Sequence, residues 1–136
     1  MNGYLLDTNV LSEVIRKRPA DSVLRRLRAL APEALFTSSI CVMELRFGAA
    51  RVPHGVALWQ RIRREVLPLV GILPVGEAAA LRAGETLAAL ESRGERIGVE
   101  DLLIASTALT HGLAVATRNV KHLSRVAGLV VESWWS

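Results

Sequence analysis

The chain has 136 residues, 51% of them hydrophobic, and its 17 lysines and arginines against 13 aspartates and glutamates give a formal net charge of +4 at pH 7. This composition excludes a disordered segment, and the length predicts a single domain over residues 1–136 that buries a core of its own. One cysteine excludes internal disulfides and cysteine-based zinc sites, and the lack of a secretory leader or membrane-spanning apolar run predicts a cytoplasmic protein.

Short apolar runs typical of buried strands alternate with stretches whose apolar residues recur at helical spacing. In chain order, this pattern predicts a strand at 4–6, helices at 10–15 and 21–30, a strand at 34–37 and a helix at 40–50. It then predicts a basic helix at 55–66, a strand at 70–75, helices at 77–92 and 102–110, and strands at 113–117 and 129–131. The alternation favours an α/β sandwich around a parallel sheet of about five strands, with ligands bound beyond the strands' carboxyl ends.

Asp7 and Glu44 are the first two polar residues that this geometry singles out. Asp7 follows the first predicted strand, where it either caps the next helix or belongs to a ligand site. Glu44 shares the apolar face of its predicted helix with Phe47, and a carboxylate on an inward face needs a partner. That partner is either Arg51, in an ion pair, or a metal ion.

Asp101 and Asn119 belong to the other half of the chain. Asp101 opens the helix predicted at 102–110, where a carboxylate also compensates the helix dipole, and Asn119 follows the fourth predicted strand at a typical turn position. If that strand pairs with the first, three carboxylates and an amide meet at one edge of the sheet. Clustered carboxylates repel one another unless a cation neutralises them, and all-oxygen donors favour Mg²⁺ or Mn²⁺.

Arginine supplies nearly all of the positive charge, because Lys17 and Lys121 are the only lysines. Arginine clusters at 16–18, 25–28 and 61–64 are either solvated helix faces or a surface that attracts phosphate groups. An acidic, metal-loading pocket on a basic surface is the arrangement that a phosphodiesterase acting on nucleic acid needs.

Four segments, in order, resemble the motifs of PIN-domain proteins. They are 5–13 (LLDTNVLSE), 39–48 (SICVMELRFG), 101–105 (DLLIA) and 116–119 (ATRN). The resemblance covers essentially the whole chain and is strongest to the VapC toxins of type II toxin–antitoxin modules, in particular the FitB-like branch. It implies a three-layer α/β/α sandwich, an Mg²⁺-dependent ribonuclease and a homodimer. It also implies a cognate VapB- or FitA-like antitoxin, through which the toxin is held on promoter DNA.

Carried over by position, Asp7, Glu44 and Asp101 match the metal-binding acids of this family, and Asn119 matches a fourth position that is Asp in many relatives. The missing fourth carboxylate favours one metal ion, or a second recruited only with substrate. In the resulting hypothesis, Asp7 and Asp101 hold Mg²⁺ directly or through water. Glu44 helps to hold it or acts as general base, and Asn119 orients water or phosphate. Mn²⁺ is a possible substitute.

Other polar and aromatic residues are assigned structural roles. Surface or helix-capping positions are expected for the three histidines, His54, His111 and His122. Cys41 is expected in the core, and Trp134 and Trp135 on the domain's own surface. Thr8 and Thr117 flank the acidic edge, where strand-end hydrogen bonding is the preferred interpretation. The helix at 55–66, with Trp59, is either core or part of an antitoxin groove.

Two alternatives stay open for the function. The first is a housekeeping PIN-domain nuclease that processes RNA without an antitoxin. The second is a weakly catalytic or non-catalytic partner in a DNA-bound autorepressor complex, with a site weakened by Asn119. A neighbouring gene for a DNA-binding antitoxin excludes the first alternative, and metal-dependent cleavage by the purified protein excludes the second.

Overall fold

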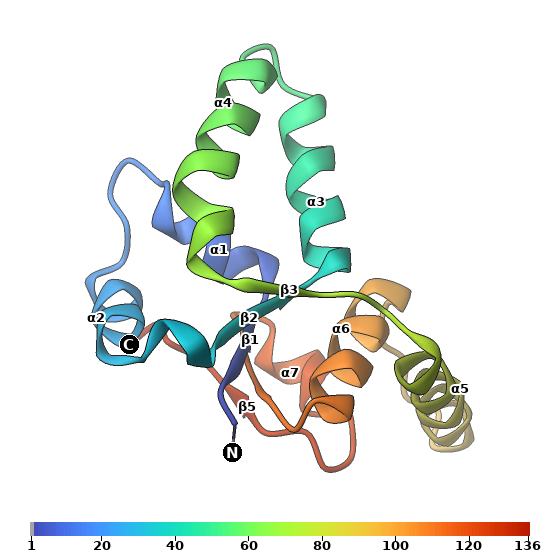
Figure 1. Ribbon diagram of the computed structural model, residues 1–136. Coiled ribbons are helices and arrows are strands. Elements are labelled where there is room, and N and C mark those ends of the chain that lie inside the picture. The colour runs from blue at the N-terminus through green and yellow to red at the C-terminus, as the bar shows by residue number, and fades with distance from the viewer. Residues whose placement is uncertain (1) are drawn as a thin grey trace.

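The computed structural model describes residues 2–136, which contain a sheet of five parallel strands in the order β3-β2-β1-β4-β5 (Figure 1). The strands are β1 (Tyr4–Leu6), β2 (Leu35–Ser38), β3 (Gly71–Leu73), β4 (Ala114–Ala116) and β5 (Val131–Glu132). β1 and β4 are buried throughout, as strands covered by helices on both faces must be. The parallel five-stranded sheet is therefore confirmed.

Seven α-helices within residues 2–136 cover the sheet. They are α1 (Thr8–Val14), α2 (Asp21–Ala29), α3 (Ser39–Ala50), α4 (Gly55–Arg61), α5 (Glu77–Ser92), α6 (Val99–Thr110) and α7 (Val120–Leu123). α1 and α2 lie to one side of the sheet, and α6, with α5 packed against it, lies to the other (Figure 1). None of these helices is long and apolar enough to cross a lipid bilayer. The three-layer α/β/α arrangement is confirmed.

Element boundaries differ from the prediction where local sequence meets a competing constraint. The helix expected at 55–66 is α-helical only to Arg61. It continues as a π-helical turn (Ile62–Val66) and a 3-10 turn (Leu67–Leu69). Pro68 has no backbone N–H with which to continue the hydrogen bonds of an α-helix. The four-residue helix α7 was not predicted, because it is too short to show a helical period.

The C-terminal tail packs back onto the start of the chain. Trp134 is 4% exposed, and its ring meets that of Tyr4 edge-to-face with centroids 5.4 Å apart. The Arg26 guanidinium lies over both rings and pairs with Glu132 at 3.0 Å. The expectation that Trp134 packs on the domain itself is confirmed, and the tail is thereby fixed beside α2, where the chain ends in Figure 1.

Gly55 allows α3 and α4 to form an antiparallel hairpin that stands away from the sheet (Figure 1). A Cβ at Gly55 would lie 2.0 Å from the Ala49 carbonyl oxygen, so Gly55→Ala forces the two backbones apart. We expect a loss of about 1–3 kcal/mol in the free energy of unfolding, measured by urea denaturation. Gly48→Ala is the matched control, because nothing lies within 4 Å of its Cβ. Equal stability of the two variants would contradict this reading of the hairpin.

Candidate active site

Asp7 lies directly after the central strand β1 and is 4% exposed. It is the N-cap of α1, and its Oδ1 accepts a hydrogen bond from the Thr8 backbone N–H at 2.8 Å. Its Oδ2 accepts a second bond from the Thr117 hydroxyl at 2.7 Å, across from the end of β4. The capping role proposed from the sequence is thus confirmed, and the cap and the Thr117 hydroxyl together fix the carboxylate at the sheet edge.

Glu44 reaches the same edge from α3. The Thr8 hydroxyl donates to Glu44 Oε1 at 2.5 Å, so one threonine joins Asp7 through its backbone and Glu44 through its side chain. The alternative ion pair with Arg51 is wrong, because the Arg51 guanidinium lies 5.0 Å from the Phe47 ring centroid instead. The sequence placed Phe47 with Glu44 on an inward apolar face of this helix. Phe47 is instead 61% exposed, because this part of α3 belongs to the hairpin that projects from the sheet.

Asp101 and Asn119 meet in a direct contact. Asn119 Nδ2 donates to Asp101 Oδ2 at 2.7 Å, and the Asn119 backbone N–H donates to the Thr117 hydroxyl at 2.9 Å. β4 pairs with β1, as the placement of Asn119 opposite Asp7 required. His122, expected to be a plain surface residue, is exposed but lies with its Nδ1 2.7 Å from Asn119 Oδ1. Thr117 therefore connects Asp7 to the Asp101–Asn119 pair.

All four residues predicted from the sequence, Asp7, Glu44, Asp101 and Asn119, line one pocket of about 440 Å³, which we call the acidic pocket. Its lining also includes Thr8, which the sequence placed at this edge, and residues that sequence reasoning did not select as site residues: Asn9, Ser12, Glu13, Arg16, Arg118 and Trp135. Asn9, Glu13 and Arg118 lie within the first and fourth motifs, which were the available signal, whereas Trp135 reaches the pocket through a chain segment whose path only the fold reveals. A larger cavity of about 520 Å³ beside α5 contains none of the four predicted residues.

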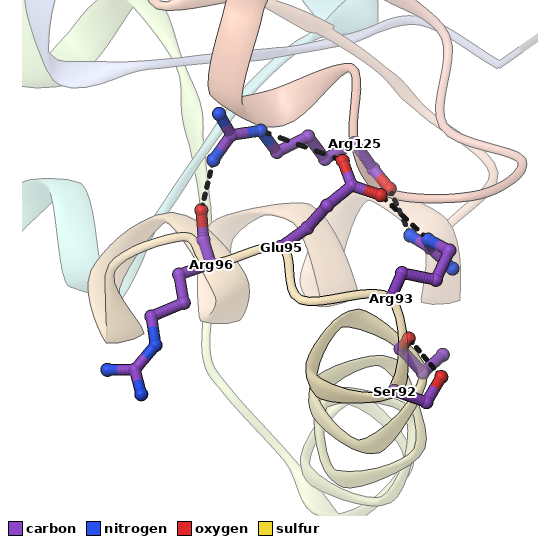
Figure 2. A network of polar contacts seen from close by, with 6 residues as sticks. Ser92, Arg93, Glu95, Arg96 and Arg125 are labelled. Atoms are coloured by element: carbon purple, nitrogen blue, oxygen red, sulfur yellow. Dashed lines mark hydrogen bonds and ion pairs between the residues drawn. The ribbon is translucent and has the colours of Figure 1, made fainter.

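The connection between α5 and α6 borders that larger cavity and is held by a separate polar network (Figure 2). Glu95 pairs with Arg93 at 2.8 Å and lies 3.8 Å from Arg125. Arg125 also donates to the Arg96 carbonyl oxygen, and Arg93 to that of Arg125 at 3.0 Å. This network pairs the Glu95 carboxylate with Arg93 and Arg125 and places no carboxylate in the acidic pocket.

Burial and the neighbouring negative charges raise the pKa of two carboxyl groups in the acidic pocket, those of Glu44 and Asp101. Burial raises the pKa of Glu44, and the negative charges of Asp7 and Asp101 add to this effect against the hydrogen bond from Thr8. Burial and the charge of Asp7 likewise raise the pKa of Asp101, opposed by His122 and Asn119. Neighbouring carboxyl groups disfavour one another's ionised form, and a bound cation would favour that form instead.

Cys41 lies beneath this cluster, with its Sγ 3.9 Å from Asp7 Oδ1. The thiol is fully buried, and burial together with the charge of Asp7 raises its pKa to about 11, so it is a core residue in its protonated form. Asp7, Cys41 and Glu44 offer ligand atoms within 4.8 Å of one another. Asp101 lines the same pocket without belonging to that close group.

Glu13 is a buried carboxylate with local partners. It is 3% exposed and accepts hydrogen bonds from the Ala20 backbone N–H at 2.8 Å and from Arg16 Nη1 at 3.1 Å. Burial alone would raise the pKa of Glu13, but these bonds hold it below its ordinary value. Glu13 thus closes the loop between α1 and α2 and presents Arg16 at the pocket.

Comparison with known proteins places this geometry in a family. The family model of the PIN domain matches residues 4–129. The chain is 38% identical to the VapC ribonuclease Y4jK of Sinorhizobium fredii, with 96% of each chain covered, and 36% identical to the toxin FitB of Neisseria gonorrhoeae, covering 96% of this chain and 97% of FitB. The structure superposes with a TM-score of 0.88 on VapBC2 from Rickettsia felis bound to a promoter DNA fragment, at 31% identity and covering 96% of this chain and 98% of that one. The chain therefore belongs to the PIN-domain family and, within it, to the group that contains the VapC and FitB proteins.

Proposed function

We propose that this protein is a metal-dependent ribonuclease and the toxin of a VapBC-like toxin–antitoxin module, acting in the cytoplasm as one PIN domain over residues 1–136. The observation that carries the proposal is the convergence of Asp7, Glu44 and Asp101 in one pocket, each held by a neighbouring hydroxyl or amide. Relatives over nearly the full length are named ribonuclease and toxin, which supports the same reaction here.

The donor set of this pocket fits a hard divalent cation. Carboxylate groups from three segments line one pocket, and burial, with a smaller contribution from the neighbouring acids, raises the pKa of Glu44 and of Asp101. Oxygen donors favour Mg²⁺ or Mn²⁺ over thiophilic metals, and the protonated Cys41 does not alter that preference. Asp7 and Asp101 would hold the ion, directly or through water, with Glu44 beside it.

The reaction is hydrolysis of an RNA phosphodiester. When bound, Mg²⁺ supplies Lewis acidity toward the phosphate and the attacking water. Thr8 and Thr117 keep the Glu44 and Asp7 carboxylates in place, as the partners of metal ligands do. Glu44, with its raised pKa, accepts the proton of the attacking water as the water oxygen bonds to phosphorus. The bond from phosphorus to the leaving nucleotide's oxygen breaks, and that oxygen takes up a proton from solvent water. Asn119 orients water or phosphate from its position against Asp101.

An antitoxin partner and promoter DNA contacted through that antitoxin are part of the proposal. The VapBC2 complex on promoter DNA supports it, because the two toxin-like chains share their fold over nearly their whole length. Exposed apolar side chains on the α3–α4 hairpin, Met43, Phe47 and Val56, are suited to protein contacts, in an antitoxin complex or in the predicted homodimer.

The function is tested with purified, antitoxin-free protein and single-stranded RNA. Cleavage is expected in Mg²⁺ or Mn²⁺ and should stop on chelation with EDTA. Rescue of arrested growth by co-expression of the product of a neighbouring antitoxin gene separates the toxin from a housekeeping nuclease. A protein that binds operator DNA with its antitoxin but cleaves no RNA in either metal would instead support the non-catalytic alternative.

Thr117→Val tests whether the hydroxyl of Thr117 positions the site. Valine keeps the shape but removes the bonds to Asp7 Oδ2 and from the Asn119 N–H. We expect cleavage to fall about 10- to 100-fold, measured as kcat/KM. Thr107→Val is the matched control, because Thr107 is equally buried and its hydroxyl bonds only the Leu103 carbonyl oxygen. If both variants lost stability but neither lost activity, Thr117 would be purely structural.

A further inference from the structure

The C-terminal tail forms one wall of the acidic pocket. Trp135 lines it together with Arg118 and Arg16, on the side facing the tail, while Asp7 and Glu44 line the same pocket from the sheet edge. Trp135 also lines a second cavity, of about 460 Å³, which it shares with Arg25 and Arg26 of α2. The Trp135 ring therefore lies between the acidic pocket and a second hollow, in which Arg26 is paired with Glu132 and Arg25 has no carboxylate within 4.0 Å among residues 2–136.

The two tail tryptophans differ in how their polar atoms are satisfied. Trp134 is buried against Tyr4, and its indole N–H donates to Glu132 Oε1 at 3.3 Å. Trp135 is half-buried, and its indole N–H has no acceptor within residues 2–136. Trp134 is thus the anchor of the tail, whereas Trp135 is held at the pocket with an unused hydrogen-bond donor.

Arginines supply the charge that a phosphate needs at this wall. The Arg118 guanidinium carbon lies 4.9 Å from the Trp135 ring centroid, and no carboxylate of residues 2–136 lies within 4.0 Å of that guanidinium. The Arg118 backbone N–H donates to Asn9 Oδ1 at 3.1 Å, which ties this arginine to the first motif. Arg16 keeps its side chain 60% exposed while bonded to Glu13.

We propose that Trp135 is a stacking platform for a base of single-stranded RNA next to the scissile phosphate, with Arg118 and Arg16 binding the flanking phosphates. This inference rests on the proposed ribonuclease function and names the part of the pocket that receives the nucleotide. Aromatic faces flanked by arginines are the usual elements of single-strand binding, because every base has a face that stacks and every linkage carries a charge.

Kinetics on a mixed-sequence single-stranded RNA test this platform. Trp135→Leu keeps apolar bulk but loses the stacking surface, so KM is expected to rise about 10-fold. The dissociation constant for the same RNA, measured by fluorescence anisotropy in an Asp7→Asn background, should rise equally. Trp135→Phe keeps an aromatic face and should stay within about threefold of the wild type. Thermal melts check that the variants fold.

Trp59→Leu is the matched control, because Arg46 lies 5.1 Å from the Trp59 ring centroid in the same arrangement, away from the acidic pocket. The inference is wrong if Trp135→Leu leaves KM and the dissociation constant unchanged, or if Trp135→Phe loses as much as Trp135→Leu. A loss of antitoxin affinity without a loss of RNA affinity would assign the platform to a protein partner instead. Wild-type protein that fails to cleave RNA overturns the proposed function itself, whereas intact cleavage with an indifferent Trp135 overturns the platform alone.

Discussion

Asp7→Asn is expected to lower RNA cleavage by about 10²- to 10³-fold while the protein stays folded, because several kcal/mol of metal-assisted stabilisation depend on this carboxylate. Asparagine caps helices as well as aspartate does, so the bond from the Thr8 N–H to the side chain of residue 7 is retained. The substitution therefore removes the charge and keeps the cap. Asp7→Ala would lose both, and its effect on activity would be mixed with about 1 kcal/mol of lost helix capping.

The measurement for Asp7→Asn is kcat/KM at saturating Mg²⁺, with a thermal melt of the same sample. Asp21→Asn is the control, because Asp21 is exposed at the start of α2 and makes no side-chain capping bond. We expect wild-type cleavage from Asp21→Asn. Full Mg²⁺-dependent activity in Asp7→Asn would show that the site proposed here is not the catalytic one.

Glu44→Gln is expected to act in opposite directions on activity and on stability. Glutamine can still accept the Thr8 hydroxyl bond, but it can neither take the proton of an attacking water nor attract a cation. Cleavage should fall about 10²-fold. In EDTA at neutral pH, removing one of the crowded charges should raise the melting temperature by about 2–4 °C.

The sign of this stability effect follows from the pKa of Glu44. Burial, with the charges of Asp7 and Asp101, raises that pKa above its ordinary value of 4.5, so the folded state binds more protons than the unfolded state just above that pH. Stability of the metal-free protein therefore falls as the pH rises from 4.5 through the raised pKa. The gain from Glu44→Gln should appear over this range and vanish at lower pH.

Melting curves in EDTA across this pH range measure the effect. Glu91→Gln, at an exposed position on α5, is the control and should not change with pH in the same way. A melting temperature for Glu44→Gln that is equal to or below that of the wild type throughout would contradict the electrostatic account. Added Mg²⁺ should reverse the order, because only the wild type gains the stability of a well-bound ion.

Much of the fold was predictable because buried parallel strands read as continuous apolar runs. The run at Tyr4–Leu6 is followed by Asp7, and the run at Ala114–Ala116 ends three residues before Asn119, so the pairing of β1 with β4 brings both to one edge. Asp101 joins them because α6 begins at that edge. The four site residues were thus accessible from strand ends and helix starts, together with the motif resemblance.

The remaining site residues depend on contacts that no local pattern encodes. Trp135 reaches the pocket only because Trp134 anchors the tail against Tyr4, more than 100 residues earlier in the chain. The Glu44–Arg51 pair, one of the two alternatives for Glu44, does not form because the α3–α4 hairpin leaves the sheet, and Arg51 instead lies over the exposed Phe47. His122 is exposed, as expected of a surface or capping histidine, but its contact with Asn119 depends on α7, which is too short to be recognised in the sequence.

The central claim is that Asp7, Glu44 and Asp101 form a divalent-cation site. Its most direct test is a Mn²⁺ titration of the metal-free protein, followed by electron paramagnetic resonance of the free ion, without RNA or antitoxin. The wild type should bind Mn²⁺ saturably, with competition by Mg²⁺, and Asp7→Asn should weaken that binding at least about 10-fold. Equal Mn²⁺ binding by the wild type and Asp7→Asn would contradict the claim.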